Sequence, residues 1–159
     1  MLTSLWRLKV ARLARIVNDC FVGGRYEDAL EPAVRAVELS TKHLGKEHPS
    51  TLVSVNNLAG LYASQGRYDE AEPLYERALE ARERVLGKEH PDTLVSVNNL
   101  AALYERQGRY DEAEPLYERA LEASERVLGK EHPSTLGSVN NLAGLYERQG
   151  RYDEAEPLY

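Results

Sequence analysis

Apolar side chains recur at steps of three and four along residues 51–65, which is the spacing of one face of an α-helix. This face is made of Leu52, Val55, Leu58, Ala59 and Tyr62. Pro49 marks the start of the helix, because proline suits the first helical position, and Gly66 follows its last turn, where glycine readily takes the left-handed conformation. The pattern predicts a helix over Thr51–Gln65.

A second amphipathic stretch follows after only a few residues, from Tyr68 to Leu86. Its apolar face is Ala71, Leu74, Tyr75, Ala78, Leu79 and Val85. Pro73 falls inside the stretch and removes one backbone hydrogen bond, which predicts a mild bend, and Gly87 closes it. The short connection predicts that the two helices lie antiparallel.

This pair of helices is written almost four times along the chain. Residues 90–131 match residues 48–89 at 37 of 42 positions, and residues 132–159 match residues 90–117 at 25 of 28. A period of this length is typical of a solenoid. We therefore expect an all-α fold, with one array over residues 1–159 built of units at about 6–47, 48–89, 90–131 and 132–159, the last incomplete.

The first 17 residues are basic, acid-free and amphipathic, so they fit either an organelle transit segment or the first helix of the array. The repeat register favours the helix. When the 42-residue period is extended toward the N-terminus without a gap, Gly24 aligns with Gly66, Leu13 with Val55 and Ile16 with Leu58.

Charge and cysteine content narrow the class of partner. The net charge is −6, with +4 in the first 15 residues and therefore −10 in the remainder. An acidic body is repelled by nucleic acid and anionic lipid, so neither is a favoured partner. No apolar run is long enough to span a membrane. The single cysteine, Cys20, fits a reducing compartment, and we expect a cytoplasmic protein.

Residues at fixed places in each unit resemble the tetratricopeptide repeat, or TPR. In the second unit they are Leu58, Ala59, Tyr62, Gly66, Tyr68, Ala71, Tyr75 and Ala78. The 42-residue length and the segments NNLA, GRYDEAEPLYERALE and LGKEHP are similar to the repeats of kinesin light chains. They are also similar to arrays that follow nucleotide-binding regulatory domains. The resemblance implies a right-handed α-solenoid of antiparallel helix hairpins, a TPR superhelix whose first helices line a concave groove that holds a peptide or a partner helix.

Paired asparagines in the first helix of three units are the strongest candidates for ligand contact. They are Asn56 and Asn57, Asn98 and Asn99, and Asn140 and Asn141. Asparagine is a poor helix former, so its repetition needs a reason. An amide can pair with the backbone of a bound peptide whatever its sequence. The family resemblance favours Asn57, Asn99 and Asn141. The alternative is that the asparagines bond each other or neighbouring helices and set only the stacking.

Other candidates lie where the nearly identical units differ. Gly60, Ala102 and Gly144 leave room for a ligand backbone. One turn further on, the second unit has Ala63-Ser64, whereas the third and fourth units have Glu105-Arg106 and Glu147-Arg148. Such variation fits either tuning of the groove or drift at exposed sites. In the first unit Arg15 replaces the second asparagine, and it would suit a carboxylate at that end of the groove.

The sequence contains no pattern that indicates catalysis. His48, His90 and His132 recur because the loop recurs, and no second ligand at metal-binding spacing accompanies them. Phosphate loops and nucleophile–base sets are not found either. We therefore expect no enzyme activity, no metal and no cofactor.

The leading hypothesis is a non-catalytic scaffold that binds a peptide or helix of a partner protein in the groove. One alternative is self-association by end-to-end stacking of exposed terminal repeats into a homo-oligomer. Another is a regulatory or sensor repeat domain of a larger signalling ATPase.

Overall fold

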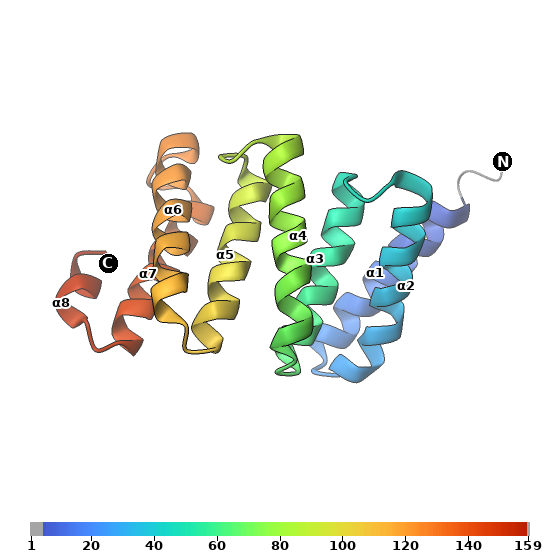
Figure 1. The fold of residues 1–159 in the computed structure, drawn as a ribbon, viewed down its shortest axis with the longest axis horizontal. Coiled ribbons are helices and arrows are strands. Elements are labelled where there is room, and N and C mark those ends of the chain that lie inside the picture. The colour runs from blue at the N-terminus through green and yellow to red at the C-terminus, as the bar shows by residue number, and fades with distance from the viewer. Residues whose placement is uncertain (1–4, 159) are drawn as a thin grey trace. The chain divides into compact units, whose positions relative to one another are not determined.

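The computed structural model describes residues 5–158, which form eight α-helices and a final 3₁₀ turn, with no strand among them (Figure 1). Successive helices run antiparallel in hairpins, so the all-α fold expected from the repeats is confirmed. In chain order the elements are α1 (Leu5–Val22), α2 (Tyr26–Leu44), α3 (Pro49–Ser64), α4 (Tyr68–Leu86), α5 (Pro91–Arg106), α6 (Tyr110–Leu128), α7 (Pro133–Arg148), α8 (Tyr152–Ala155) and η1 (Glu156–Leu158).

A glycine turn ends the first helix of each unit, and Gly66 shows its geometry. Gly66 has φ +73°, and the Arg67 amide reaches back to the Tyr62 carbonyl at 2.9 Å. This bond is the long closing contact of a left-handed helix cap. The Arg67 guanidinium then lies over the Tyr62 ring, 4.5 Å from its centroid. The turn therefore directs the chain from α3 into α4 and also fixes a side-chain contact.

Histidine caps the start of the first helix in the second, third and fourth repeats. The Nδ1 atom of His48 accepts the Ser50 amide at 3.1 Å, His90 accepts Asp92 at 3.2 Å, and His132 accepts Ser134 at 3.1 Å. A helix leaves its first amides without partners, and an acceptor side chain at the cap satisfies one of them. Helix α3 accordingly begins at Pro49, two residues before the predicted start, and ends at Ser64 rather than Gln65.

The helices form two compact units, divided within α4 between Arg82 and Glu83. We call the part up to Arg82 the first unit and the part from Glu83 onward the second unit; each contains more than one repeat. In the first unit, α1 takes the place that the repeat register predicted for it. The core around Val17, Cys20, Ala29 and Leu58 includes residues of α1, α2 and α3. Cys20, a free thiol, is buried in that core.

The second unit packs α5, α6 and α7 against one another. Alanines with no exposed surface, such as Ala101, Ala113 and Ala143, lie among larger buried side chains such as Leu103 and allow the helices to approach closely. The Thr135 hydroxyl, also buried, donates to the Gly129 carbonyl at 2.8 Å and ties α7 to the loop before it. Within the second unit, consecutive repeats are thus joined by both apolar packing and buried polar bonds.

Candidate peptide-binding face

One face of α5 combines the predicted site residues with small and apolar neighbours. Val95, Asn99, Ala102 and Arg106 follow one another at steps of four, three and four, so they share a face of the helix. Val95 is 48% exposed, Arg106 is exposed, and Asn99 and Ala102 are half-buried. We call this set the α5 stripe.

The same places on α7 form the α7 stripe, which is Gly137, Asn141, Gly144 and Arg148. Asn141 and Arg148 are exposed. A Cβ added at Gly144 would meet nothing within 4 Å, so the space beside this glycine is open. Because α5 and α7 are in contact, the second unit presents two equivalent stripes on neighbouring helices.

The first asparagine of the α5 pair joins two helices. Asn98 donates from Nδ2 to the Ser138 hydroxyl of α7 at 3.2 Å, and the buried Ser138 hydroxyl donates to the Ser134 carbonyl at 3.2 Å. Asn98 therefore has the stacking role that was the alternative for these asparagines. Its counterparts differ in exposure, since Asn140 is exposed and Asn56 is half-buried.

Glu105 lies at the junction of three helices. Its carboxylate accepts the Tyr117 hydroxyl of α6 at 2.7 Å and forms an ion pair with Arg148 of α7 at 2.9 Å. The Glu105 side chain is only 10% exposed, whereas that of Arg148 is 60% exposed. Burial, and then the bond to Glu105, raises the pKa of Tyr117 above its ordinary value. Glu105 thus positions Arg148 at the end of the α7 stripe.

In the first unit, α3 and α1 carry the corresponding residues. Asn57 is exposed on α3, and Arg15, at the equivalent place, is exposed on α1. Near the end of α3, the Ser64 hydroxyl donates to the Gly60 carbonyl at 2.8 Å. Ala63, which occupies the place of Glu105, is buried. This unit therefore lacks the carboxylate junction of the second unit.

Tyr117 and Ser138 contribute to this face and were not singled out from the sequence. The histidines were interpreted as loop residues, whereas the structure shows that they cap helices. A signal for the histidines does exist, because each stands directly before the proline that begins a helix, which is the capping position. No comparable signal distinguishes Glu105 as a helix-joining residue, because its partners come from two other helices.

A sequence profile of the tetratricopeptide repeat matches residues 9–84, 53–123 and 95–159. The chain belongs to the tetratricopeptide repeat family. The TPR resemblance and the solenoid fold class expected from the sequence are thereby confirmed. A search of the curated proteins found no match.

Solved structures agree with this assignment. The chain is 33% identical to nearly identical TPR-like repeats of the kinesin light chain type from Podosopora anserina, with a TM-score of 0.80 over 98% of this chain and 72% of that one. A single-residue variant of the same protein matches equally well, with 71% of its length covered. BtubC (BKLC) from P. vanneervenii has 25% identity and a TM-score of 0.82, over 94% of this chain and 59% of that one.

TPR repeats are in general non-catalytic scaffolds that mediate contacts between proteins. Over residues 5–158, no three histidine, cysteine, aspartate or glutamate side chains gather where they could hold a metal ion. Within the same residues, no helix combines the length and the apolar character needed to cross a bilayer.

Proposed function

We propose that the α5 and α7 stripes bind a peptide segment or helix of a partner protein, and that the bound segment is held chiefly by Asn99 and Asn141. The observation that carries this proposal is the placement of these two asparagines at the same position on neighbouring first helices, each beside a small residue. In this arrangement, equivalent amides face the ligand at consecutive repeats.

Each part of the stripe has a distinct task in this proposal. The asparagine amides donate to and accept from the ligand backbone, which gives binding that tolerates different sequences. Ala102 and Gly144 let that backbone approach closely. Arg106 and Arg148 attract acidic side chains of the ligand, and Val95, which is exposed, offers an apolar contact.

Asn57 and Arg15 have equivalent roles in the first unit. Both are exposed, and Arg15 adds a cation where the later repeats have an amide. A ligand that ends in a carboxylate suits this position, because a guanidinium bonds both carboxylate oxygens. We therefore expect ligands of the first unit to carry a carboxylate that Arg15 can bind.

A peptide-display selection tests the proposal. The selection is made on the natural chain, and the enriched peptides are then measured against a variant with Asn57, Asn99 and Asn141 changed to Ala. We expect at least about tenfold weaker binding, because each buried amide bond contributes about 1 kcal/mol. Glu76→Ala, at an exposed position of α4, is the matched control and should bind normally. Unchanged binding by the triple variant would reject the asparagine ladder.

Self-association is a second candidate function, favoured by exposed apolar residues of α1. Leu5 is 55% exposed and Leu8 is 66% exposed. Light scattering over a range of protein concentrations tests this candidate, and a strict monomer at high concentration removes it. A cytoplasmic location stays a prediction, which imaging of the whole protein tests. A role as the sensor of a signalling ATPase also stays a prediction, which the flanking sequence tests.

A further inference from the structure

Two arginines accompany the Glu105 carboxylate at the ends of the α5 and α7 stripes. The Oε2 atom of Glu105 accepts the Tyr117 hydroxyl at 2.7 Å, and its Oε1 atom lies 2.9 Å from Nη1 of Arg148. Arg106 follows Glu105 in the chain. Burial is the main cause of the raised pKa of Tyr117, and the charges of Arg148 and Arg106 both oppose that rise. Both guanidinium groups therefore lie within electrostatic range of the carboxylate junction.

The two arginines stay open to solvent when another repeat lies next to them. Arg106 is exposed although the α7 repeat follows it, and Arg148, at the same register position, is 60% exposed although the α5 repeat precedes it. Exposure of this position is therefore compatible with a neighbouring repeat on either side. A guanidinium has five N–H donors, so those of Arg148 that Glu105 does not use can bond a ligand.

Arg106, Arg148 and Glu105 together leave one positive charge at the junction, because one carboxylate balances one of the two guanidinium groups. Glu105 cannot turn into solvent, since both of its oxygen atoms are bonded and its side chain is only 10% exposed. Glu147, which precedes Arg148, is exposed and adds negative charge at the rim of the junction. The junction therefore has room for little negative charge beyond one unit.

We propose that Glu105 determines which anionic group the stripes accept, namely the single carboxylate of a ligand aspartate or glutamate in preference to a phosphoryl group. The ligand carboxylate pairs with Arg106 and Arg148. This inference rests on the stripe function proposed above and adds a specificity role for Glu105. That role is exerted through the charge of Glu105 and through its hold on Arg148, so Glu105 itself need not touch the ligand.

Charge balance is the physical reason for this preference. One ligand carboxylate cancels the positive charge that remains at the junction. A phosphoryl group carries about −1.5 to −2 charge near neutral pH and would leave an excess of negative charge beside Glu105. Because Glu105 is nearly buried, water and salt screen this repulsion only weakly. In the first unit, Ala63 and Ser64 occupy the places of Glu105 and Arg106, so the preference belongs to the second unit.

The test compares three forms of one peptide from the display selection, with glutamate, glutamine or phosphoserine at its acidic position. Fluorescence anisotropy measures the affinity of each form for the full natural chain. We expect the glutamate peptide to bind about tenfold more tightly than the glutamine peptide, and the phosphoserine peptide to bind no more tightly than the glutamate peptide.

Replacing Glu105 should change this preference. We expect Glu105→Gln to strengthen binding of the glutamate peptide about threefold and of the phosphoserine peptide about tenfold, because the electrostatic free energy scales with the charge of the ligand. Glu122→Gln removes an equal charge from α6, at a side chain that is 81% exposed, and should leave the ratio of the two affinities unchanged. Circular dichroism checks that both variants keep the helical fold. If Glu105→Gln does not fold, the affinities of the natural chain for the three peptides decide the matter.

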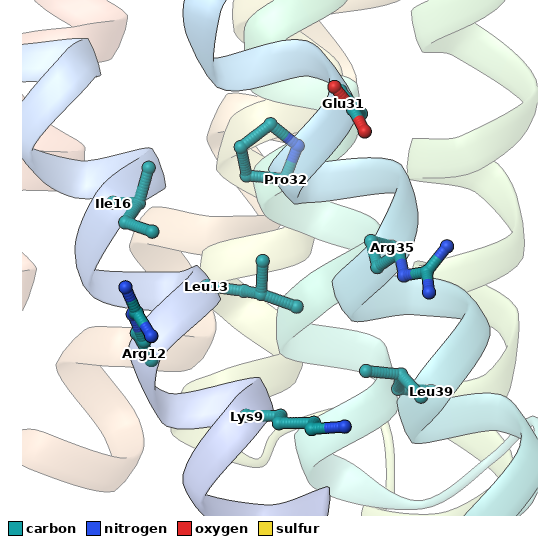
Figure 2. Close-up of a pocket in the computed structure, with 8 residues that line it drawn as sticks. All are labelled: Lys9, Arg12, Leu13, Ile16, Glu31, Pro32, Arg35 and Leu39. Carbon is teal, nitrogen blue, oxygen red and sulfur yellow. The ribbon is translucent and has the colours of Figure 1, made fainter.

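Acidic peptides can also meet the cations of the first unit, so a second control is needed there. Lys9, Arg12 and Arg35 line a groove between α1 and α2 (Figure 2). We expect Arg12→Ser to leave the ratio of the glutamate and phosphoserine affinities unchanged. A ratio that changes with Arg12→Ser and not with Glu105→Gln would place the acidic residue of the peptide at that groove and would contradict the inference.

Three further results would overturn the inference and leave the stripes in place. One is a phosphoserine peptide that binds the natural chain about tenfold more tightly than the glutamate peptide. Another is an equal change of both affinities in Glu105→Gln, which would make Glu105 a structural residue only. The last is a set of enriched peptides that share no acidic residue. A selection that enriches no peptide would instead reject the stripe proposal, and the inference with it.

Discussion

At the scale of single residues, the recurring histidines illustrate how a side chain acquires its role from its neighbours. His48, His90 and His132 each precede the proline that begins a first helix, and each accepts the amide two residues ahead through Nδ1. That bond requires the proton of the neutral imidazole to be on Nε2. The repetition of histidine is therefore explained by helix capping.

Replacing the cap tests this role. We expect His90→Ala to lower the free energy of unfolding by about 1 kcal/mol, since the Asp92 amide loses its acceptor. His90→Asn should restore most of the loss, because asparagine is among the best capping residues. Urea unfolding followed by circular dichroism measures both. Equal destabilisation by the two substitutions would show that the histidine acts through something other than its acceptor.

Tyr117 supplies a second test at this scale, with a defined pH dependence. Its hydroxyl donates to Glu105, and the side chain is 2% exposed. We expect Tyr117→Phe to cost about 1.5–3 kcal/mol near neutral pH, which is the usual range for a hydrogen bond to a charged group. A cycle with Glu105→Ala should show that the two losses are not additive.

The pKa of Tyr117 is raised in the folded chain, so its contribution to stability is complete below the unfolded value of about 10. As the pH rises above that value, the unfolded chain loses its proton first, and the contribution declines. The difference in unfolding free energy between the natural chain and Tyr117→Phe should therefore shrink between about pH 9 and pH 11. A difference that stays constant over this range would contradict the assignment.

At the scale of helices, the sequence predicted the second helix of the repeat better than the first. The bounds of α4, Tyr68–Leu86, were predicted because an amphipathic period is closed by a glycine at each end. Pro49 was recognised as the start signal of α3, but the predicted range began two residues late, at Thr51, and the histidine cap was not anticipated. Adjacent asparagines could not be separated either, since Asn98 reaches Ser138 only through the packing of α5 on α7. That packing depends on residues 40 positions apart.

The glycines inside the first helices give a matched pair of substitutions. Gly144→Ala should raise the free energy of unfolding by about 0.5–1 kcal/mol, because alanine is the better helix former and its Cβ meets nothing within 4 Å. Gly60→Ala should gain less, since its Cβ would lie 3.3 Å from the Tyr75 hydroxyl. Thermal or urea unfolding of both variants measures the difference. A larger gain at residue 60 would contradict the packing described for α3.

The Gly144→Ala variant also reports on function at the same scale. If a ligand backbone approaches the α7 stripe closely at Gly144, the added methyl group should weaken binding of selected peptides while the fold becomes more stable. The opposing directions separate a ligand contact from a folding defect. Unchanged affinity would show that the ligand does not contact the stripe at this turn.

At the scale of the whole molecule, one repeated hairpin provides both the internal packing and the proposed contact surface. Residues that recur in the second, third and fourth repeats build the packing, as Ala59, Ala101 and Ala143 do. Exposed amides on the first helices are proposed to contact an extended ligand. The TPR family assignment predicts the scaffold, whereas the partner must be read from the residues that differ between units.

The most direct test of the central claim is an NMR titration of the ¹⁵N-labelled chain with a peptide from the display selection. The account predicts that the side-chain amide signals of Asn57, Asn99 and Asn141 shift in a saturable manner, with smaller changes for Asn98, which is already bonded to Ser138. Saturable binding that leaves the signals of Asn57, Asn99 and Asn141 unmoved, with shifts confined to the second helices of the repeats, would contradict it.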